Sequence, residues 1–244
     1  MSKQYKDKTC VYCTKPRRSS TRDHVIARGF FPLVDRDKIK LPIVPSCNEC
    51  NNEKSNLETY LTSILPFGAN PSEFGAELAQ RATERLQKNN KLSMPVVRSL
   101  HELKNINLDR LPLPLDGIKL ERLCQYIAQG LAFFHWKVLL PMDKCIIQYF
   151  SPSNSLLNEL DNLINSEPSE NRVTNEWTSN AFSYHGTQFI ECTEFTLWKM
   201  SFYGFNIKGD SPESPMIDKV FVLTCPKNSP AVASRFSKYV NGSN

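Results

Sequence analysis

Two four-residue stretches of this 244-residue chain, CVYC at residues 10–13 and CNEC at residues 47–50, decide how its N-terminal quarter folds. Each stretch places two thiols two residues apart, a spacing at which both can turn toward one metal ion. Two such pairs complete a tetrahedron, so the sequence predicts a structural Zn²⁺ held by Cys10, Cys13, Cys47 and Cys50. The pairs are 33 residues apart, whereas an ordinary zinc ribbon has about 15 to 20. We therefore expect the insert between them to carry a function of its own.

The insert and the residues that follow it contain a second pattern. Residues 22–28 read RDHVIAR, and residues 47–54 read CNECNNEK. In this order the chain resembles the HNH (His-Asn-His, or ββα-metal) endonuclease superfamily, whose pattern is CxxC, then D/E-H-V/I, then CxxCNxxK. The resemblance covers about residues 8–65, a quarter of the chain. It implies a zinc-stapled ββα-metal nuclease that cuts double-stranded DNA, in bacterial or phage defence among other settings.

The resemblance also implies a role for each matching residue. His24 would activate water, and Asp23 and Asn51 would hold a catalytic Mg²⁺ or Mn²⁺. The residue types suit these roles, because imidazole titrates near neutral pH and oxygen donors suit hard cations. Neighbouring side chains on a strand face opposite ways, so Asp23 and His24 can approach one phosphate only where the strand bends or ends. We expect phosphate contacts from a set of basic residues that comprises Lys54, Arg22, Arg28, Arg17 and Arg18.

One position departs from the family pattern. The family places a structural Asn five residues before the second cysteine pair, where this chain has Pro42. Phe30, Phe31 and Pro32 loosely match a branch of the superfamily with F-P after the D-H motif, and we expect their packing to replace the Asn.

Simpler readings of these residues stay open. Asp23 can be an ion-pair partner of Arg22 or Arg28, and Asn51 can be a helix cap, with Asn48 as a rival. Lys54 and the arginines can be solvated surface side chains. His101, His135 and His185 show no ligand spacing and are interpreted as structural or surface residues. The alternative function is a non-catalytic zinc module that binds nucleic acid or a protein, and a third is a nuclease directed at RNA.

Composition limits the class of protein. The apolar share is 40% and the charged share 23%, which excludes a disordered, collagen-like or coiled-coil chain. The longest apolar run, residues 127–140, is too short to span a bilayer, and the first residues show no secretory signal. We expect a cytoplasmic protein with reduced cysteines, of which Cys124, Cys145, Cys192 and Cys225 are core residues. Residues 1–55 carry twelve Lys and Arg against six Asp and Glu, which favours a polyanionic partner.

Periodicity predicts an α+β fold: a nuclease module at residues 1–65, then a helical region and a small antiparallel sheet at residues 66–244. Strands are expected at 21–27 and 41–44, ended by Pro45 and Ser46, and a helix at 48–65. Further helices are expected at 71–90, 116–136 and 156–164, with residues 151–175 otherwise a surface region. Strands are expected at 182–184, 194–205 and 219–224, with turns at Gly186, Gly204 and Gly209-Asp210 and a boundary at 111–115. The sheet is expected to pack on helix 116–136. Contact with DNA, homodimerisation and ligand sensing remain open for residues 66–244.

Overall fold

The fold is mixed α+β, as the sequence predicts. A computed structural model describes residues 3–68, 73–89, 94, 115–150, 154–177, 181–203, 207–208, 216–217 and 219–228. The predictions for Gly204, Gly209-Asp210, His101 and parts of 71–90, 111–115 and 194–205 lie outside these residues.

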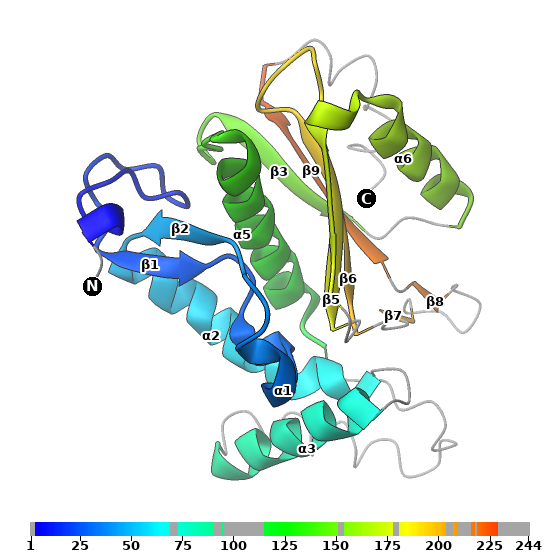
Figure 1. Ribbon diagram of the computed structural model, residues 1–244. Helices are drawn as coiled ribbons and strands as arrows, with labels where there is room; N and C mark the ends of the chain where they lie inside the picture. Colours follow the sequence, from blue (N-terminus) through cyan, green and yellow to red (C-terminus); the bar gives the residue numbers. More distant parts are fainter. Residues whose placement is uncertain are drawn as a thin grey trace.

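The N-terminal quarter forms a hairpin followed by a helix (Figure 1). Strand β1 (Thr21–His24) pairs antiparallel with β2 (Ile43–Ser46), and α2 (Asn48–Ile64) follows directly. Strand β1 ends at His24, three residues before the predicted end, because a 3₁₀ turn forms over Arg28–Phe30. The prediction that Pro45 ends the second strand is wrong, since Pro45 pairs with Arg22 inside β2. A proline is tolerated there because β2 is an edge strand of a two-stranded sheet.

Helix α5 (Gly117–Trp136) lies between this hairpin and a larger sheet (Figure 1). The Asp116 side chain caps its first turn by accepting from the Lys119 N–H. One face of α5 contacts α2 and β2, and another contacts the sheet. A Cβ at Gly130 would lie 2.7 Å from Val25, so glycine is what permits the close approach of helix and hairpin. The main cluster of buried apolar residues accordingly includes members from both parts of the chain.

The larger sheet is antiparallel, with strand order β3-β9-β6-β5-β4. In that order its strands span Cys145–Phe150, Lys219–Pro226, Thr196–Phe202, Phe182–Gln188 and Arg172–Glu176. Helix α5 covers one face, which confirms the predicted packing, and α6 (Asn154–Ser166) covers the other. Strand β4 lies in the stretch interpreted as surface region or linker. Its residues, RVTNE, are mostly polar because β4 is an edge strand.

Gly186 corrects a second prediction, because it lies inside β5 and not in a turn. It pairs with Trp198 of β6, where a Cβ would come within 2.3 Å of the indole ring. Trp198 is fully buried. The glycine therefore makes room for a large side chain in the core.

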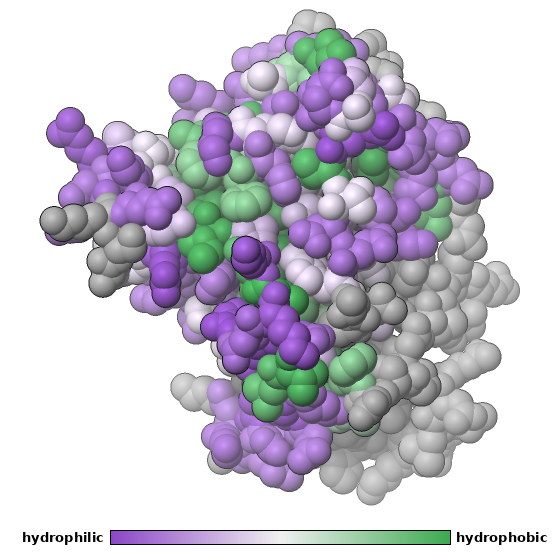
Figure 2. All heavy atoms as spheres, viewed as in Figure 1, coloured by the Kyte–Doolittle hydropathy of each residue, from purple (hydrophilic) through white to green (hydrophobic). Residues whose placement is uncertain are grey.

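The remaining elements are short or peripheral. They comprise α1 (Leu33–Arg36), α3 (Glu73–Lys88) and the pair β7 (Ile207–Lys208) and β8 (Met216–Ile217). In Figure 2 the visible face is largely hydrophilic, with a hydrophobic patch over α1, where Leu33 and Val34 are exposed.

Within the described ranges, no helix combines the length and apolarity needed to cross a bilayer. The predicted core cysteines Cys124, Cys145 and Cys225 are buried, and Cys192 is half-buried.

Candidate functional site

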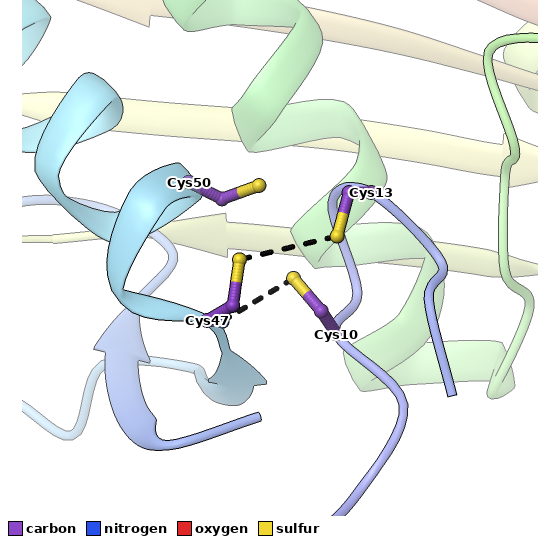
Figure 3. Close-up of side chains that lie close together, drawn as sticks. All are labelled: Cys10, Cys13, Cys47 and Cys50. Carbon is purple, nitrogen blue, oxygen red and sulfur yellow. Dashed lines mark hydrogen bonds between the residues drawn. The ribbon is translucent and has the colours of Figure 1, made fainter. Parts of the chain in front are cut away.

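Four cysteines meet beside the hairpin and form the thiol cluster (Figure 3). Cys10 and Cys13 come from the N-terminal loop, whereas Cys47 and Cys50 come from the start of α2. All four Sγ atoms lie within 4.8 Å of one another, and those of Cys13 and Cys47 are 3.9 Å apart. Zinc–sulfur bonds of about 2.3 Å in a tetrahedron place the sulfurs about 3.8 Å apart. The thiol cluster can therefore hold a metal ion such as zinc.

Backbone N–H groups stabilise the thiolate form of one cysteine in the thiol cluster. The Cys47 N–H donates to the Cys10 Sγ at 3.3 Å. Burial opposes ionisation of Cys10, but hydrogen bonds from the backbone of Cys13, Cys47 and Tyr12 leave the pKa of its thiol below the ordinary value. Burial raises the pKa of Cys47 to about 11 and raises that of Cys50 further. The Cys47 and Cys50 thiols therefore stay protonated at neutral pH unless a cation binds, and metal binding would release their protons.

A pocket of about 400 Å³ opens beside the end of β1, and we call it the His24 pocket. It is lined by Asp23, His24 and Asn51, the three residues that the sequence predicts to be catalytic. Strand β1 ends at His24, so the neighbouring Asp23 and His24 side chains both reach one pocket despite strand alternation. Arg22 and Arg28 also line it. The fold thus brings together residues that are 27 positions apart in the chain.

Asp23 is 7% exposed and lies in a buried polar group. Its Oδ2 accepts a short hydrogen bond from the Tyr12 hydroxyl and lies 3.0 Å from the Lys54 Nζ. Asp23 is therefore an ion-pair partner of Lys54, and not of Arg22 or Arg28, the two partners weighed from the sequence. Burial, followed by the charge of Asp23, raises the pKa of Tyr12 well above its ordinary value, so Tyr12 stays a donor.

Lys54 corrects the prediction of a phosphate contact. Its side chain is fully buried, where it pairs with Asp23 and, through a short contact, with Glu58. Its Nζ also donates to the His24 carbonyl at 2.8 Å. Because the Lys54 ammonium makes all these contacts inside the protein, it binds the His24 backbone and is not exposed to solvent. The charges of Asp23 and Glu58 outweigh burial and raise the pKa of Lys54.

The sequence patterns did not predict a role for Glu58, although it lies four residues after Lys54, a spacing typical of helical ion pairs. It lines the His24 pocket. Burial raises the pKa of the Glu58 carboxyl to about 6, against the opposing effect of Lys54. Arg85 of α3 is a second pocket residue that sequence reasoning missed, because it lies outside the matching motif.

The imidazole of His24 is uncharged at neutral pH, the form that can accept a proton. Burial lowers the pKa of its imidazole below 6.5, and the positive charges of Arg28 and Arg22 add to this effect. The Nδ1 atom is buried and has no hydrogen-bond partner among the described residues. The Nε2 atom is therefore the ring nitrogen that can meet a ligand in the pocket.

Comparison with protein-family models, with curated proteins and with solved structures finds no match to this chain.

Asn51 lies in the first turn of α2 and lines the His24 pocket. It is not the cap of that helix, and neither is Asn48, because Cys47 holds the N-cap position. The Asn51 N–H donates to the Cys47 carbonyl, so the second cysteine pair directly fixes the backbone of Asn51. The thiol cluster and the His24 pocket thus share one helix terminus.

The predicted phosphate-contact arginines divide into two groups. Arg22 and Arg28 line the His24 pocket, where Arg28 also pairs with Asp37 at 2.8 Å. Arg17 and Arg18 are exposed and do not line it. Arg18 pairs with Glu49 at 2.7 Å, beside the thiol cluster.

The other histidines and the missing Asn strut fit the expectations from the sequence. His135 bonds to the Tyr184 hydroxyl at 3.0 Å and His185 pairs with Glu176 at 2.9 Å, as structural residues do. Phe30 and Phe31 are fully buried in the main core. At the position of the family's Asn, the Pro42 carbonyl accepts from the Val25 N–H at 2.9 Å. A backbone bond therefore ties the loop to the strand.

Proposed function

We propose that this protein is a metal-dependent endonuclease of the HNH (ββα-metal) type that hydrolyses phosphodiester bonds of double-stranded DNA. The observation that carries the proposal is the His24 pocket, which gathers Asp23, His24 and Asn51 beside the thiol cluster. The hairpin-then-helix order of β1, β2 and α2 supports it, because the motif residues lie at the strand end and the helix start that such a module requires.

His24 would act as the general base. Its imidazole is neutral at pH 7 because its pKa lies below 6.5, so it can accept a proton from water. The bond from the Lys54 ammonium to the His24 carbonyl holds this residue in place at the end of β1. The proton would be taken up at Nε2, the accessible nitrogen.

The oxygen donors of the pocket fit a hard divalent cation. Asp23 and Asn51 would hold it, and Glu58 is a second carboxylate in the same pocket. Both contacts of Asp23 use Oδ2, so Oδ1 is the atom left for a cation. A bound Mg²⁺ or Mn²⁺ would supply charge neutralisation at the phosphate and at the leaving oxygen. The thiol cluster would hold a structural Zn²⁺ that fixes the two CxxC segments.

Charge supports a polyanionic substrate. Arg22, Arg28 and Arg85 come from three different elements or loops and all line the His24 pocket. Three guanidinium groups exceed the two carboxylates there, Asp23 and Glu58, both of which pair with the buried Lys54. This balance favours binding of a phosphate backbone.

Cleavage of supercoiled plasmid in Mg²⁺ or Mn²⁺ tests the proposal. Wild-type protein is compared with His24→Ala, Asn51→Ala and the matched control His185→Ala, which changes a histidine of the distant sheet. We expect His24→Ala to slow cleavage by about 10²- to 10⁴-fold, the usual contribution of a general base. His185→Ala should cut at the wild-type rate, and EDTA should stop cleavage.

The outcomes separate the competing functions. Equal rates for wild type and His24→Ala would exclude His24 as the base. Metal-independent DNA binding without any cleavage, unchanged in Asn51→Ala, would favour the non-catalytic zinc module. Cleavage of an RNA duplex or single strand in preference to DNA would transfer the proposal to RNA.

A further inference from the structure

Arginines converge on the short backbone segment that follows β1. The Arg36 Nε and the Arg81 Nη1 both donate to the Phe31 carbonyl, at 3.1 and 3.3 Å. The Arg36 Nη2 lies 3.5 Å from the Gly29 carbonyl. Two guanidinium groups from α1 and α3 therefore meet at one oxygen atom.

A third guanidinium completes what we call the arginine cluster, namely Arg36, Arg81 and Arg85. Arg85 donates to the Thr62 carbonyl at 2.8 Å, and its Nη2 would be 3.8 Å from a Cβ at Gly29. Gly29 and Arg85 also line the His24 pocket. The arginine cluster is thus continuous with that pocket.

Tyr203 directly follows β6 of the larger sheet and packs against Phe30, next to Gly29. Its ring lies 6.0 Å from that of Phe30, and its hydroxyl is buried with no hydrogen-bond partner among the described residues. Its backbone is left-handed, with φ at 57°, which is strained for a bulky side chain. The charges of Arg85, Arg81 and Arg36 all act on this hydroxyl. Among the described residues this buried donor therefore has no acceptor.

The carboxylates of the described residues do not balance the charge of the arginine cluster. Among the described residues, Glu77 pairs with Arg81 at 3.5 Å, and neither Arg36 nor Arg85 forms an ion pair. Burial, then the charges of Arg81 and Arg85, lower the pKa of Arg36 to about 10. Each guanidinium has five N–H donors, of which the backbone carbonyls use one or two. The remaining donors and the excess positive charge call for an anion.

We propose that Arg36, Arg81, Arg85 and the Tyr203 hydroxyl form a phosphate-binding site. The ligand would be a backbone phosphate of the same DNA strand whose scissile phosphate lies in the His24 pocket, so this assignment rests on the proposed function. Continuity through Arg85 and Gly29 supports it, because neighbouring phosphates of one strand follow one another along a continuous basic surface.

Two ligands test the site separately. Binding of inorganic phosphate is measured by calorimetric titration at constant ionic strength, and binding of a 20-base-pair DNA duplex is measured in parallel. The variants are Arg81→Gln and Tyr203→Phe. Tyr203→Phe keeps the fold even if Arg81→Gln does not, because it removes a hydroxyl without a partner. Matched controls are Arg172→Gln, an arginine that also donates to a main-chain carbonyl, and Tyr149→Phe. All duplex measurements use the His24→Ala background, in which cleavage does not interfere.

We expect both variants to bind phosphate about tenfold more weakly than wild type, and the duplex about tenfold more weakly, while both controls bind normally. Unchanged phosphate affinity in both variants would overturn the site. Loss of phosphate binding with unchanged duplex affinity would overturn the DNA assignment and leave a site for free phosphate. If phosphate binding by the wild type and duplex binding in the His24→Ala background are as expected but the wild type cuts no nucleic acid, the proposed function fails while the phosphate site stands.

Discussion

Replacing Lys54 by methionine tests the buried charge arrangement beneath the candidate site. The Lys54 ammonium is fully buried and lies 3.0 Å from the Asp23 Oδ2, with Glu58 on its other side. Removing one partner of a buried ion pair typically costs about 3–5 kcal/mol, because the remaining charge loses its compensation. For a chain of this size, 1 kcal/mol shifts Tm by about 2–4 °C. We therefore expect Lys54→Met to lower Tm by roughly 6–20 °C at pH 8.

The effect of Lys54→Met should also depend on pH. The folded-state pKa of Glu58, about 6, lies above its ordinary 4.5, so its stabilising contribution is complete below pH 4.5 and lost as pH rises to about 6. That loss corresponds to about 2 kcal/mol in the wild type. Lys54 opposes the rise in the pKa of Glu58, so its removal raises this pKa further and extends the loss above pH 6. The difference between variant and wild type should therefore grow from pH 5 to pH 8.

Thermal denaturation measures the shift in Tm, and chemical denaturation measures the free energy of unfolding; both are done with zinc supplied, at pH 5 and at pH 8. Lys119→Met is the matched control, because its ion pair with Asp116 is largely exposed and is worth at most about 1 kcal/mol. A Lys54→Met variant that loses less than 1 kcal/mol at pH 8, or loses as much at pH 5, would refute the reasoning.

Three further predictions concern the metal, the base and the core. Purified protein should carry one zinc ion per chain by metal analysis, and Cys47→Ser should lower this value while Cys192→Ser, outside the thiol cluster, should not. The single-turnover cleavage rate should rise with pH as His24 loses its proton, with its midpoint below pH 6.5 because burial lowers the pKa of His24; a midpoint above 6.5 would contradict this. Gly186→Ala should destabilise the fold by about 1–3 kcal/mol in denaturant titrations, since its Cβ would overlap a buried indole, whereas Gly117→Ala meets no atom within 4 Å and should change little.

Local patterns of the sequence were sufficient for the helices. Leu120, Leu123, Ile127 and Leu131 recur at helical spacing, and all four are buried in α5. The start of α5 was predictable as well, because Asp116 is a favourable cap. The thiol cluster and three residues of the His24 pocket, Asp23, His24 and Asn51, followed from the spacing of CxxC and the position of Asp-His, which are properties of short segments.

The predictions that failed concern residues whose environment depends on partners distant in the sequence. Lys54 looks like a surface lysine in the run NNEKSN, and its burial depends on Asp23, which lies 31 positions earlier. Gly186 looks like a turn residue until the ring of Trp198 is placed opposite it. The polar strand β4 shows no alternation strong enough to predict, since it becomes a strand by pairing with β5.

The larger body of the chain contributes to the position of Asp23, although no residue beyond position 65 belongs to the CxxC, Asp-His and CxxCN pattern. The Gln129 amide of α5 donates to the Tyr12 carbonyl at 3.1 Å, and the Tyr126 ring meets that of Tyr12 edge-on at 4.9 Å. Tyr12 in turn donates its hydroxyl to the Asp23 Oδ2. Because buried hydrogen bonds of this kind are directional and each contributes about 1 kcal/mol, a shift of α5 would move the donor that orients Asp23. Helix α5 also contacts the larger sheet, so the helix that positions Tyr12 is itself held by the packing of the C-terminal part of the chain.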